Sequence, residues 1–250
     1  MSILNYNLRI GNDLKDGSRY LDATSITNDR SYKVAMLALH HFQEHFKKLV
    51  ESGELSGIHK YEEVDFLISY KDLRDIVPGI SHLRANDFEK YFRPLAGLII
   101  NTELNGEFYA NPLFTEVHYL PNKGLQFIIN PRIWKRFNLL NSNYYTIMLP
   151  HLKKLKKQET IKLYQFLKQR VSHVEGNIVQ PTNGILIPIN YLREMFNREK
   201  TYREDKTFLQ KVVKPALAQI NEHTDLDIVD SWRKRGTNDY YICFIYNPTK

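Results

Sequence analysis

The sequence predicts an α+β fold in which one supersecondary unit occurs twice. Each half of the chain contains, in order, a helix, a short strand, a short helix, a longer helix and a β-hairpin pattern. Segments of the two halves also align at a period of about 120 residues, which indicates an internal duplication. The length of 250 residues fits one large or two small domains, and 42% hydrophobic with 25% charged residues is typical of a globular protein.

In the first unit, apolar residues at helical spacing predict an amphipathic helix over residues 31–50. Ser31 and Asp29 are its candidate caps, and Gly53 is placed to end it. The preceding residues, 1–30, are polar and show no sustained period. We therefore expect an N-terminal arm or a short irregular element there.

A short strand, two helices and a β-ribbon are expected next. Ser69 is placed to cap the first of these helices, and Pro78 with Gly79 is placed to end it. Strand-like runs then alternate with turns that contain Asn and Gly. The expected elements are a strand over 64–69, helices over 70–77 and 83–95, strand runs over 98–104, 107–120 and 125–129, and turns at 105–106 and 122–124.

The second unit repeats this order after a join between residues 131 and 157. Its last two strands pair through a turn at 236–239. The expected elements are helices over 159–171, 189–196 and 202–224, and strands over 185–187, 226–232 and 240–246. The buried face of the last helix is predicted to comprise Leu209, Val212, Val213, Leu217 and Ile220.

Two stretches indicate the duplication residue by residue. Ile68-Ser-Tyr-Lys-Asp-Leu-Arg-Asp-Ile-Val77 aligns with Ile187-Pro-Ile-Asn-Tyr-Leu-Arg-Glu-Met-Phe196. A second alignment pairs Arg93-Pro-Leu-Ala96 with Lys214-Pro-Ala-Leu217, and with it Lys90 with Lys211 and Ile99 with Ile220.

A three-helix core with a strand after the first helix and a hairpin after the third is a winged helix, a variant of the helix-turn-helix. We therefore predict two tandem winged-helix domains related by internal duplication. The first covers residues 31–140 and follows the arm; the second covers residues 141–250.

Charge is divided unevenly between the two halves. Residues 1–131 hold 14 Lys and Arg against 17 Asp and Glu, whereas residues 132–250 hold 21 against 11, so the balances are −3 and +10. A half-chain this basic favours a polyanionic partner such as nucleic acid or an anionic membrane surface. The alternative is a solvated, lysine-rich surface without a partner.

A winged helix places its third helix in a major groove and its hairpin wing on the backbone or in the minor groove. Lys and Arg on both elements would then face phosphates, and neighbouring polar residues would reach base edges. The alternative for the helix is a solubilising face. The candidate DNA contacts of the second unit are Lys200, Tyr202, Arg203, Lys206, Thr207, Gln210, Lys211 and Lys214, with Arg233, Lys234 and Arg235 at the wing tip.

The first unit is a weaker candidate for groove binding. Arg84, Lys90 and Arg93 lie on its expected third helix, but Asp87 and Glu89 are interleaved with them. Its ribbon is acidic and apolar, which fits a protein interface or simple core packing. We expect this unit to serve dimerisation or auxiliary DNA contact.

Several other function classes are disfavoured by the motifs. His41 and His45 with Glu44 form an H-x-x-E-H phrase of zinc peptidases, but no third ligand is identifiable. The sequence contains no His-apolar-His triplet of a rolling-circle nickase, no Walker A or G-x-G-x-x-G loop and no G-x-S-x-G. We therefore expect no enzyme activity, no metal and no cofactor. A nuclease, the remaining enzyme class, would show metal-dependent nicking of supercoiled DNA.

The compartment is expected to be the cytoplasm. Cys243 is the only cysteine, so no internal disulfide can form, which favours a reducing environment. The first residues lack the pattern of a signal peptide, and the long uncharged stretches contain Asn, Pro and Gly, so no membrane segment is predicted.

Three phrases of the second half resemble one known family. They are Glu159-Thr-Ile-Lys-Leu-Tyr-Gln-Phe-Leu-Lys-Gln, Ile189-Asn-Tyr-Leu-Arg-Glu-Met-Phe, and the stretch from Tyr202 through Lys214-Pro-Ala-Leu-Ala-Gln-Ile-Asn-Glu-His-Thr-Asp-Leu226. Over residues 141–246 the chain is similar to the iteron-binding plasmid replication initiator (Rep) proteins. The resemblance is weak over the first half.

The resemblance implies two winged-helix domains that bind direct repeats at a bacterial plasmid origin. It implies opening of adjacent AT-rich DNA with host factors, recruitment of host replication proteins, and a homodimer that represses its own gene. Carried over to this chain, DNA contacts fall on Lys200, Arg203, Lys206, Thr207 and Gln210, with Arg233, Lys234 and Arg235 from the wing. The alternative function is a winged-helix transcriptional repressor without a role in replication.

Overall fold

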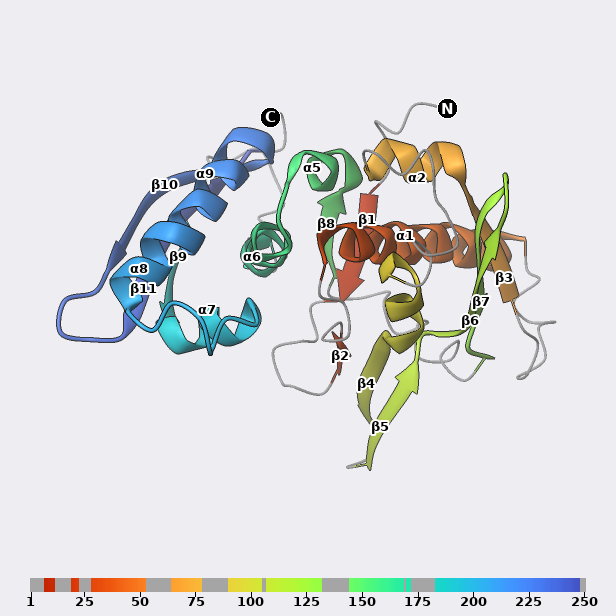
Figure 1. Ribbon diagram of the computed structural model, residues 1–250, viewed down its shortest axis with the longest axis horizontal. Helices are drawn as coiled ribbons and strands as arrows, with labels where there is room; N and C mark the ends of the chain where they lie inside the picture. The colour runs from red at the N-terminus through yellow and green to blue at the C-terminus, as the bar shows by residue number, and fades with distance from the viewer. Residues whose placement is uncertain are drawn as a thin grey trace. The chain divides into compact units, whose positions relative to one another are not determined.

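The computed structural model describes residues 7–11, 19–22, 28–52, 64–77, 90–104, 107–131, 144–168, 170–171 and 183–247. The chain divides into two compact units, Met1–Lys153 and Lys154–Lys250, and each is described by itself (Figure 1). No helix in these described ranges is long and apolar enough to cross a membrane.

The first unit is built around the long helix α1 (Asp29–Glu51), and residues 31–40 of this helix are buried on all sides. Its cap is Asn28, whose side-chain oxygen accepts the Ser31 amide at 2.8 Å. Ser31 and Asp29, the expected caps, therefore lie inside the helix. The expected stop at Gly53 lies outside the described residues.

The strand and helix that follow α1 agree closely with the sequence prediction. They are β3 (Val64–Ser69) and α2 (Tyr70–Ile76). The Ser69 hydroxyl accepts the Asp72 amide at 3.2 Å and so caps α2 as predicted. Most of the helix expected over 83–95 is outside the described residues, and its last part is the 3₁₀-helix η5 (Arg93–Gly97).

The wing of the first unit is the hairpin of β6 (Phe114–Leu120) and β7 (Gly124–Ile129), which joins β3 in an antiparallel sheet ordered β3-β7-β6. The expected single run over 107–120 is thus divided between two sheets. Pro112, which has no N–H to donate, ends the preceding strand, and the buried Leu113 makes the transition.

A second sheet and a strand pair complete this unit. β4 (Ile99–Leu104) and β5 (Glu107–Pro112) form a hairpin, and β2 (Arg19–Asp22) pairs with β4. The strand β1 (Asn7–Gly11) pairs with β8 (Tyr144–Met148), which leads into α5 (Leu149–Lys154). The stretch expected to be an irregular arm therefore contains two strands, each paired with a segment far away in the sequence.

The turn of the first wing depends on Gly124, which begins β7 opposite Ser69 with φ +146°. A Cβ atom there would lie 2.0 Å from the Ile68 carbonyl oxygen. We expect Gly124→Ala to lower the free energy of unfolding by about 2–3 kcal/mol in urea denaturation followed by circular dichroism, because backbone would have to move. Gly236→Ala is the control: φ is +79° but nothing lies within 4 Å of its Cβ, so a cost of only about 1 kcal/mol is expected. Equal costs would contradict the prediction.

The second unit has the winged-helix order predicted from the sequence. Its first helix is α6 (Gln158–Lys168), followed by β9 (Asn183–Pro188) and α7 (Ile189–Met195). The wing strands β10 (Leu226–Arg233) and β11 (Asp239–Tyr246) form an antiparallel sheet ordered β10-β11-β9.

The third helix of this unit consists of α8 (Asp205–Phe208), the π-helical turn η8 (Leu209–Val213) and α9 (Lys214–His223). We call these three segments together the recognition helix. It begins at residue 205, three residues later than predicted from the sequence. Of the five residues predicted for its buried face, four are buried and Val212 is half-buried; Phe208 and Ala216 are buried as well.

The π-helical turn has a cause in the sequence. Pro215 has no N–H, and in a regular helix its ring would press against the carbonyl four residues earlier, which belongs to Lys211. The turn widens instead, and the Lys214 amide donates to the Leu209 carbonyl five residues back. The helix thus continues through Pro215 without a break.

The internal duplication holds for one of the two aligned stretches. β3 and α2 correspond residue by residue to β9 and α7, and the aligned Leu73 and Leu192 are both buried. The second alignment does not hold throughout, because Ile99 begins a strand whereas Ile220 lies in α9.

A buried ion pair fixes the end of the recognition helix to α6. Lys168 Nζ lies 2.7 Å from Asp225 Oδ2, and the Tyr164 hydroxyl donates to Asp225 Oδ1 at 2.7 Å. Lys168 also lies 3.9 Å from the centre of the Tyr246 ring. Burial lowers the pKa of Lys168, and the Asp225 carboxylate opposes that shift.

Candidate nucleic-acid interface

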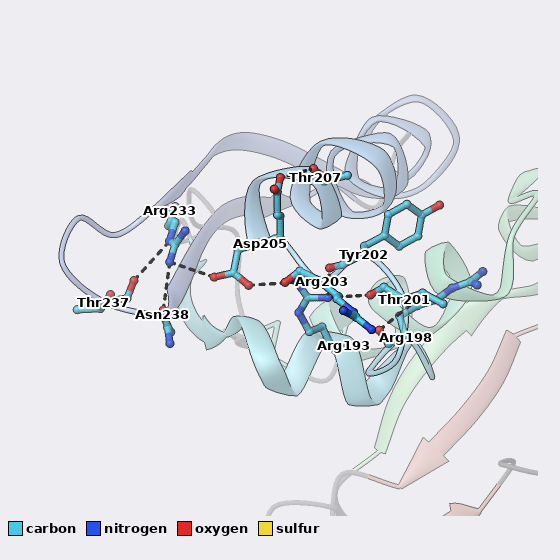
Figure 2. Close-up of polar contacts among 11 residues, drawn as sticks. Arg193, Arg198, Thr201, Tyr202, Arg203, Asp205, Thr207, Arg233, Thr237 and Asn238 are labelled. Atoms are coloured by element: carbon cyan, nitrogen blue, oxygen red, sulfur yellow. Dashed lines mark hydrogen bonds and ion pairs between the residues drawn. The ribbon is translucent and has the colours of Figure 1, made fainter.

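Three parts of the second unit converge on one surface. They are the recognition helix, the entry segment before it (residues 197–204) and the wing turn (residues 233–239). In Figure 1 the wing turn projects beside the N-terminal end of α8. Figure 2 shows the polar contacts that connect the three parts.

Arg193 of α7 holds the entry segment in place. Its buried guanidinium donates to the carbonyls of Thr201 at 3.0 Å, Tyr202 at 2.5 Å and Arg203 at 3.4 Å. It also lies 4.5 Å from the centre of the Phe208 ring. One side chain therefore satisfies three consecutive carbonyls of a segment that has no regular secondary structure.

Asp205, the first residue of the recognition helix, connects Arg193 to the wing. Its Oδ1 accepts from Arg193 at 3.1 Å, and its Oδ2 lies 3.0 Å from the guanidinium of Arg233. The same guanidinium donates to the Asn238 side chain at 3.1 Å. Arg233, which the sequence predicts as a DNA contact, forms these contacts within the protein while its side chain stays 43% exposed.

The entry segment is held in an uncommon backbone conformation. Asn197 and Tyr202 have φ values of +54° and +53°, which residues other than Gly rarely adopt. Arg198 anchors the segment to α6 through the Glu159 carboxylate, with nitrogen–oxygen distances of 2.5 and 3.0 Å. In Figure 2 the Tyr202 ring points away from the arginine network, and 40% of the residue is exposed.

Tyr202 and Arg203, both expected on the third helix, lie in the entry segment instead. Both side chains are exposed, and so is Lys200. Thr207 is half-buried, and its hydroxyl donates to the Glu204 carboxylate at 3.2 Å. The remaining candidates on the recognition helix are all exposed: Lys206, Gln210, Lys211 and Lys214. Lys214 lies in the middle of the recognition helix.

The wing turn adds further cations to this surface. Lys234 and Arg235 are exposed, and a shallow depression at the tip is lined by residues 233–238. Gly236 adopts a positive φ of +79° there, which permits the tight reversal. The exposed cations of the helix, the entry segment and the wing thus lie on neighbouring elements.

The first unit offers fewer cations at the corresponding places. Lys90 and Arg93 are exposed, and Arg84 lies outside the described residues. Its wing turn holds one cation, Lys123, and the outer face of its wing sheet carries Glu116 and Asp65. The first unit thus resembles the second in fold, but its described wing residues are less basic.

His41, the first histidine of the peptidase-like phrase, is engaged in packing, whereas Glu44 is exposed. The His41 ring stacks on Phe66 with centroids 6.2 Å apart, and burial lowers the pKa of His41. Across the described ranges, no group of three or more His, Cys, Asp or Glu side chains is placed to hold a metal ion. Cys243 is buried within β11.

Sequence reasoning did not identify Arg193 or Asp205 as part of this surface. Arg193 aligned with Arg74 of the first unit, which is exposed and donates to the Tyr70 carbonyl of its own helix. The carbonyls that Arg193 binds lie eight to ten residues further along the chain, in a segment without regular secondary structure. That environment is not visible in a linear pattern.

Comparisons with known proteins agree with this fold. The sequence model described as "Initiator Replication protein, WH1" matches residues 26–168, and the one described as "Initiator Rep protein, WH2" matches residues 188–238. The structure is similar to the "Crystal structure of Pi initiator protein in complex with iteron DNA", with a TM-score of 0.67, 17% identity and coverage of 98% of this chain and 99% of that chain. At this identity the likeness is one of fold. No curated protein is significantly similar in sequence.

Proposed function

We propose that this chain, which belongs to the initiator Rep protein family, starts plasmid replication by binding direct repeats in origin DNA through its second unit. The observation that supports this most strongly is the joint surface of the recognition helix and the basic wing turn. A major groove about 12 Å wide admits one helix, and phosphates line both of its edges. The exposed cations of this surface suit that geometry.

The residues divide by the part of the duplex they are proposed to contact. In helix-turn-helix proteins the N-terminal residues of the recognition helix reach base edges, whereas cations further out contact phosphates. We assign base-edge contacts to Tyr202, Arg203, Lys206, Thr207 and Gln210. We assign phosphate contacts to Lys200, Lys211, Lys214, Lys234 and Arg235.

The target is proposed to be iteron DNA. The Pi initiator, whose fold this chain shares, was crystallised with iteron DNA. Its likeness covers nearly the whole of both chains, so both winged-helix units have counterparts there. The proposal for this chain rests on that fold together with its own basic surface.

The first unit is proposed to support the second. Its exposed Lys90 and Arg93, with Arg84, suit auxiliary backbone contacts, and its less basic wing suits contact with protein. We propose that it mediates a homodimer that represses the chain's own gene, and that host replication proteins are further partners. The chain would act by binding, without catalysis, in the cytoplasm of a bacterial host.

A paired substitution tests the proposed contacts. Lys234→Ala is expected to weaken binding to the repeat and to scrambled duplex alike, because a phosphate contact carries no sequence information. Arg203→Ala is expected to reduce discrimination between the two duplexes by about 1–3 kcal/mol. Fluorescence anisotropy with labelled duplexes measures both. Lys157→Ala, which removes an exposed cation at the start of α6, is the control; normal binding by both test variants would contradict this assignment.

A plasmid assay distinguishes a replication initiator from a protein that only represses transcription. An origin fragment that carries the gene should replicate autonomously in a host that lacks other initiators. Footprinting of the flanking DNA should show protected direct repeats. Protection without autonomous replication would favour the repressor function.

A further inference from the structure

We propose that Asp205 is a positioning residue that ties the wing to the recognition helix, and that Arg233 is its partner rather than a phosphate contact. This inference rests on the proposed DNA-binding function and specifies how its surface is held. It assigns to an acidic side chain a role in binding a polyanion. All the contacts of Asp205 and Arg233 that follow lie within the second unit.

The first step is the geometry of Asp205. Its two carboxylate oxygens face different arginines: Oδ1 accepts a hydrogen bond from Arg193 at 3.1 Å, and Oδ2 forms an ion pair with Arg233 at 3.0 Å. Arg193 comes from α7 and Arg233 from the end of β10. One carboxylate therefore joins the two helices of the helix-turn-helix to the wing. The hydrogen bond from Arg193 is charge-assisted and therefore stronger than a neutral one.

The second step is that a backbone contact closes the connection into a ring. The Ile189 amide, at the start of α7, donates to the Asn238 carbonyl of the wing turn at 2.7 Å. The Asn238 side chain in turn accepts from Arg233 at 3.1 Å. The path α7, recognition helix, wing and back to α7 is thus continuous. Figure 2 shows the residues of its side-chain part, Arg193, Asp205, Arg233 and Asn238. A closed ring resists rotation of the wing better than one contact does.

The negative charge of Asp205 allows its two conceivable roles to be distinguished. A carboxylate beside the proposed phosphate-binding cations opposes DNA binding by simple electrostatics, so its removal alone should strengthen binding. If Asp205 positions the wing, its removal should weaken binding instead, because Lys234 and Arg235 would lose their fixed orientation. The two roles therefore predict opposite signs.

The experiment compares Asp205→Asn with Glu204→Gln in the full chain, by anisotropy titration on duplex DNA carrying the direct repeats. Glu204 is the adjacent exposed acidic residue, and its carboxylate accepts from the Thr207 hydroxyl. Gln keeps that acceptor, so Glu204→Gln removes the same charge without touching the ring. We expect Asp205→Asn to raise Kd about fivefold to tenfold, in the range of measured coupling between contacting residues. Glu204→Gln should leave Kd unchanged or lower it.

The salt dependence of binding tests the partner role of Arg233. The slope of log K against log salt concentration is negative, and loss of one phosphate contact makes it less steep by about 0.9. Lys234→Ala is expected to show this reduced steepness. Arg233→Ala is expected to raise Kd with an unchanged slope, and to be non-additive with Asp205→Asn in the double variant.

The outcomes are separable from the fate of the proposed function. If the unmodified chain shows no salt-dependent duplex binding, the proposed function fails. If the unmodified chain binds, either of two results overturns the positioning role. One is that Asp205→Asn tightens binding as Glu204→Gln does. The other is that Arg233→Ala makes the salt dependence less steep as Lys234→Ala does. Circular dichroism checks folding; should Asp205→Asn unfold, Arg233→Ala still decides, because the Arg233 side chain is 43% exposed and outside the core.

Discussion

Asp225→Ala is expected to lower the free energy of unfolding of the second unit by about 3–5 kcal/mol. The Asp225 carboxylate is the partner of the buried Lys168 ammonium, at 2.7 Å, and of the Tyr164 hydroxyl. Without it, a positive charge that is only 3% exposed would remain unpaired. Urea denaturation followed by circular dichroism and tryptophan fluorescence measures the loss.

A double-mutant cycle separates this pair from general damage to the core. Lys168→Met removes the cation, and Asp225→Asn keeps an acceptor for Tyr164. We expect the double variant to be more stable than Asp225→Asn alone, because the neutral pair leaves no buried charge. Additive losses in the cycle would show that the ion pair does not carry the effect.

Substitution of Lys206, Lys211 and Lys214 together by Ala is expected to weaken duplex binding by a factor on the order of several hundred near 0.1 M salt. All three side chains are exposed on the recognition helix. Lys211 and Lys214 are the assigned phosphate contacts of this triple, so the negative slope of log K against log salt concentration should become less steep by about 1.8. The loss of the base-edge contact assigned to Lys206 adds to the fall in affinity. Anisotropy titrations over a range of salt concentrations measure both quantities.

A matched triple variant controls for the change in net charge. Lys154 ends α5, and Lys156 and Lys157 lie between α5 and α6; all three side chains are exposed. Their replacement by Ala should reduce affinity and slope far less. Equal losses in the two triple variants would mean that total charge, and not the recognition helix, governs binding.

The elements that could be predicted from the sequence are those defined by local patterns. β3, α2, β9 and α7 were predicted to within a few residues, because apolar periodicity and a capping serine act over short distances. The basic surface was also predicted, since charge can be counted along the chain. The two winged-helix units followed from these elements in order.

The elements that were missed depend on distant partners. β1 and β2 are short strands whose pairing segments, β8 and β4, lie far along the chain, so no local pattern marks them. The late start of the recognition helix was missed because Arg193, from the preceding helix, stabilises the entry segment in a non-helical form with a positive φ at Tyr202. The pairing of Arg233 with Asp205 was missed because it depends on the tertiary fold and has no local signal in the sequence.

The widened turn before Pro215 determines the angular phase of the recognition helix. One surplus residue corresponds to about 100° of rotation about the axis of a regular helix. α9 packs on α6. The side chains of α8, among them Lys206, are therefore rotated about the helix axis by about 100° from the directions they would have if a regular helix ran from α8 into α9. A homologous helix with the same side chains but a regular turn at this point would present another side of its first turn to the groove.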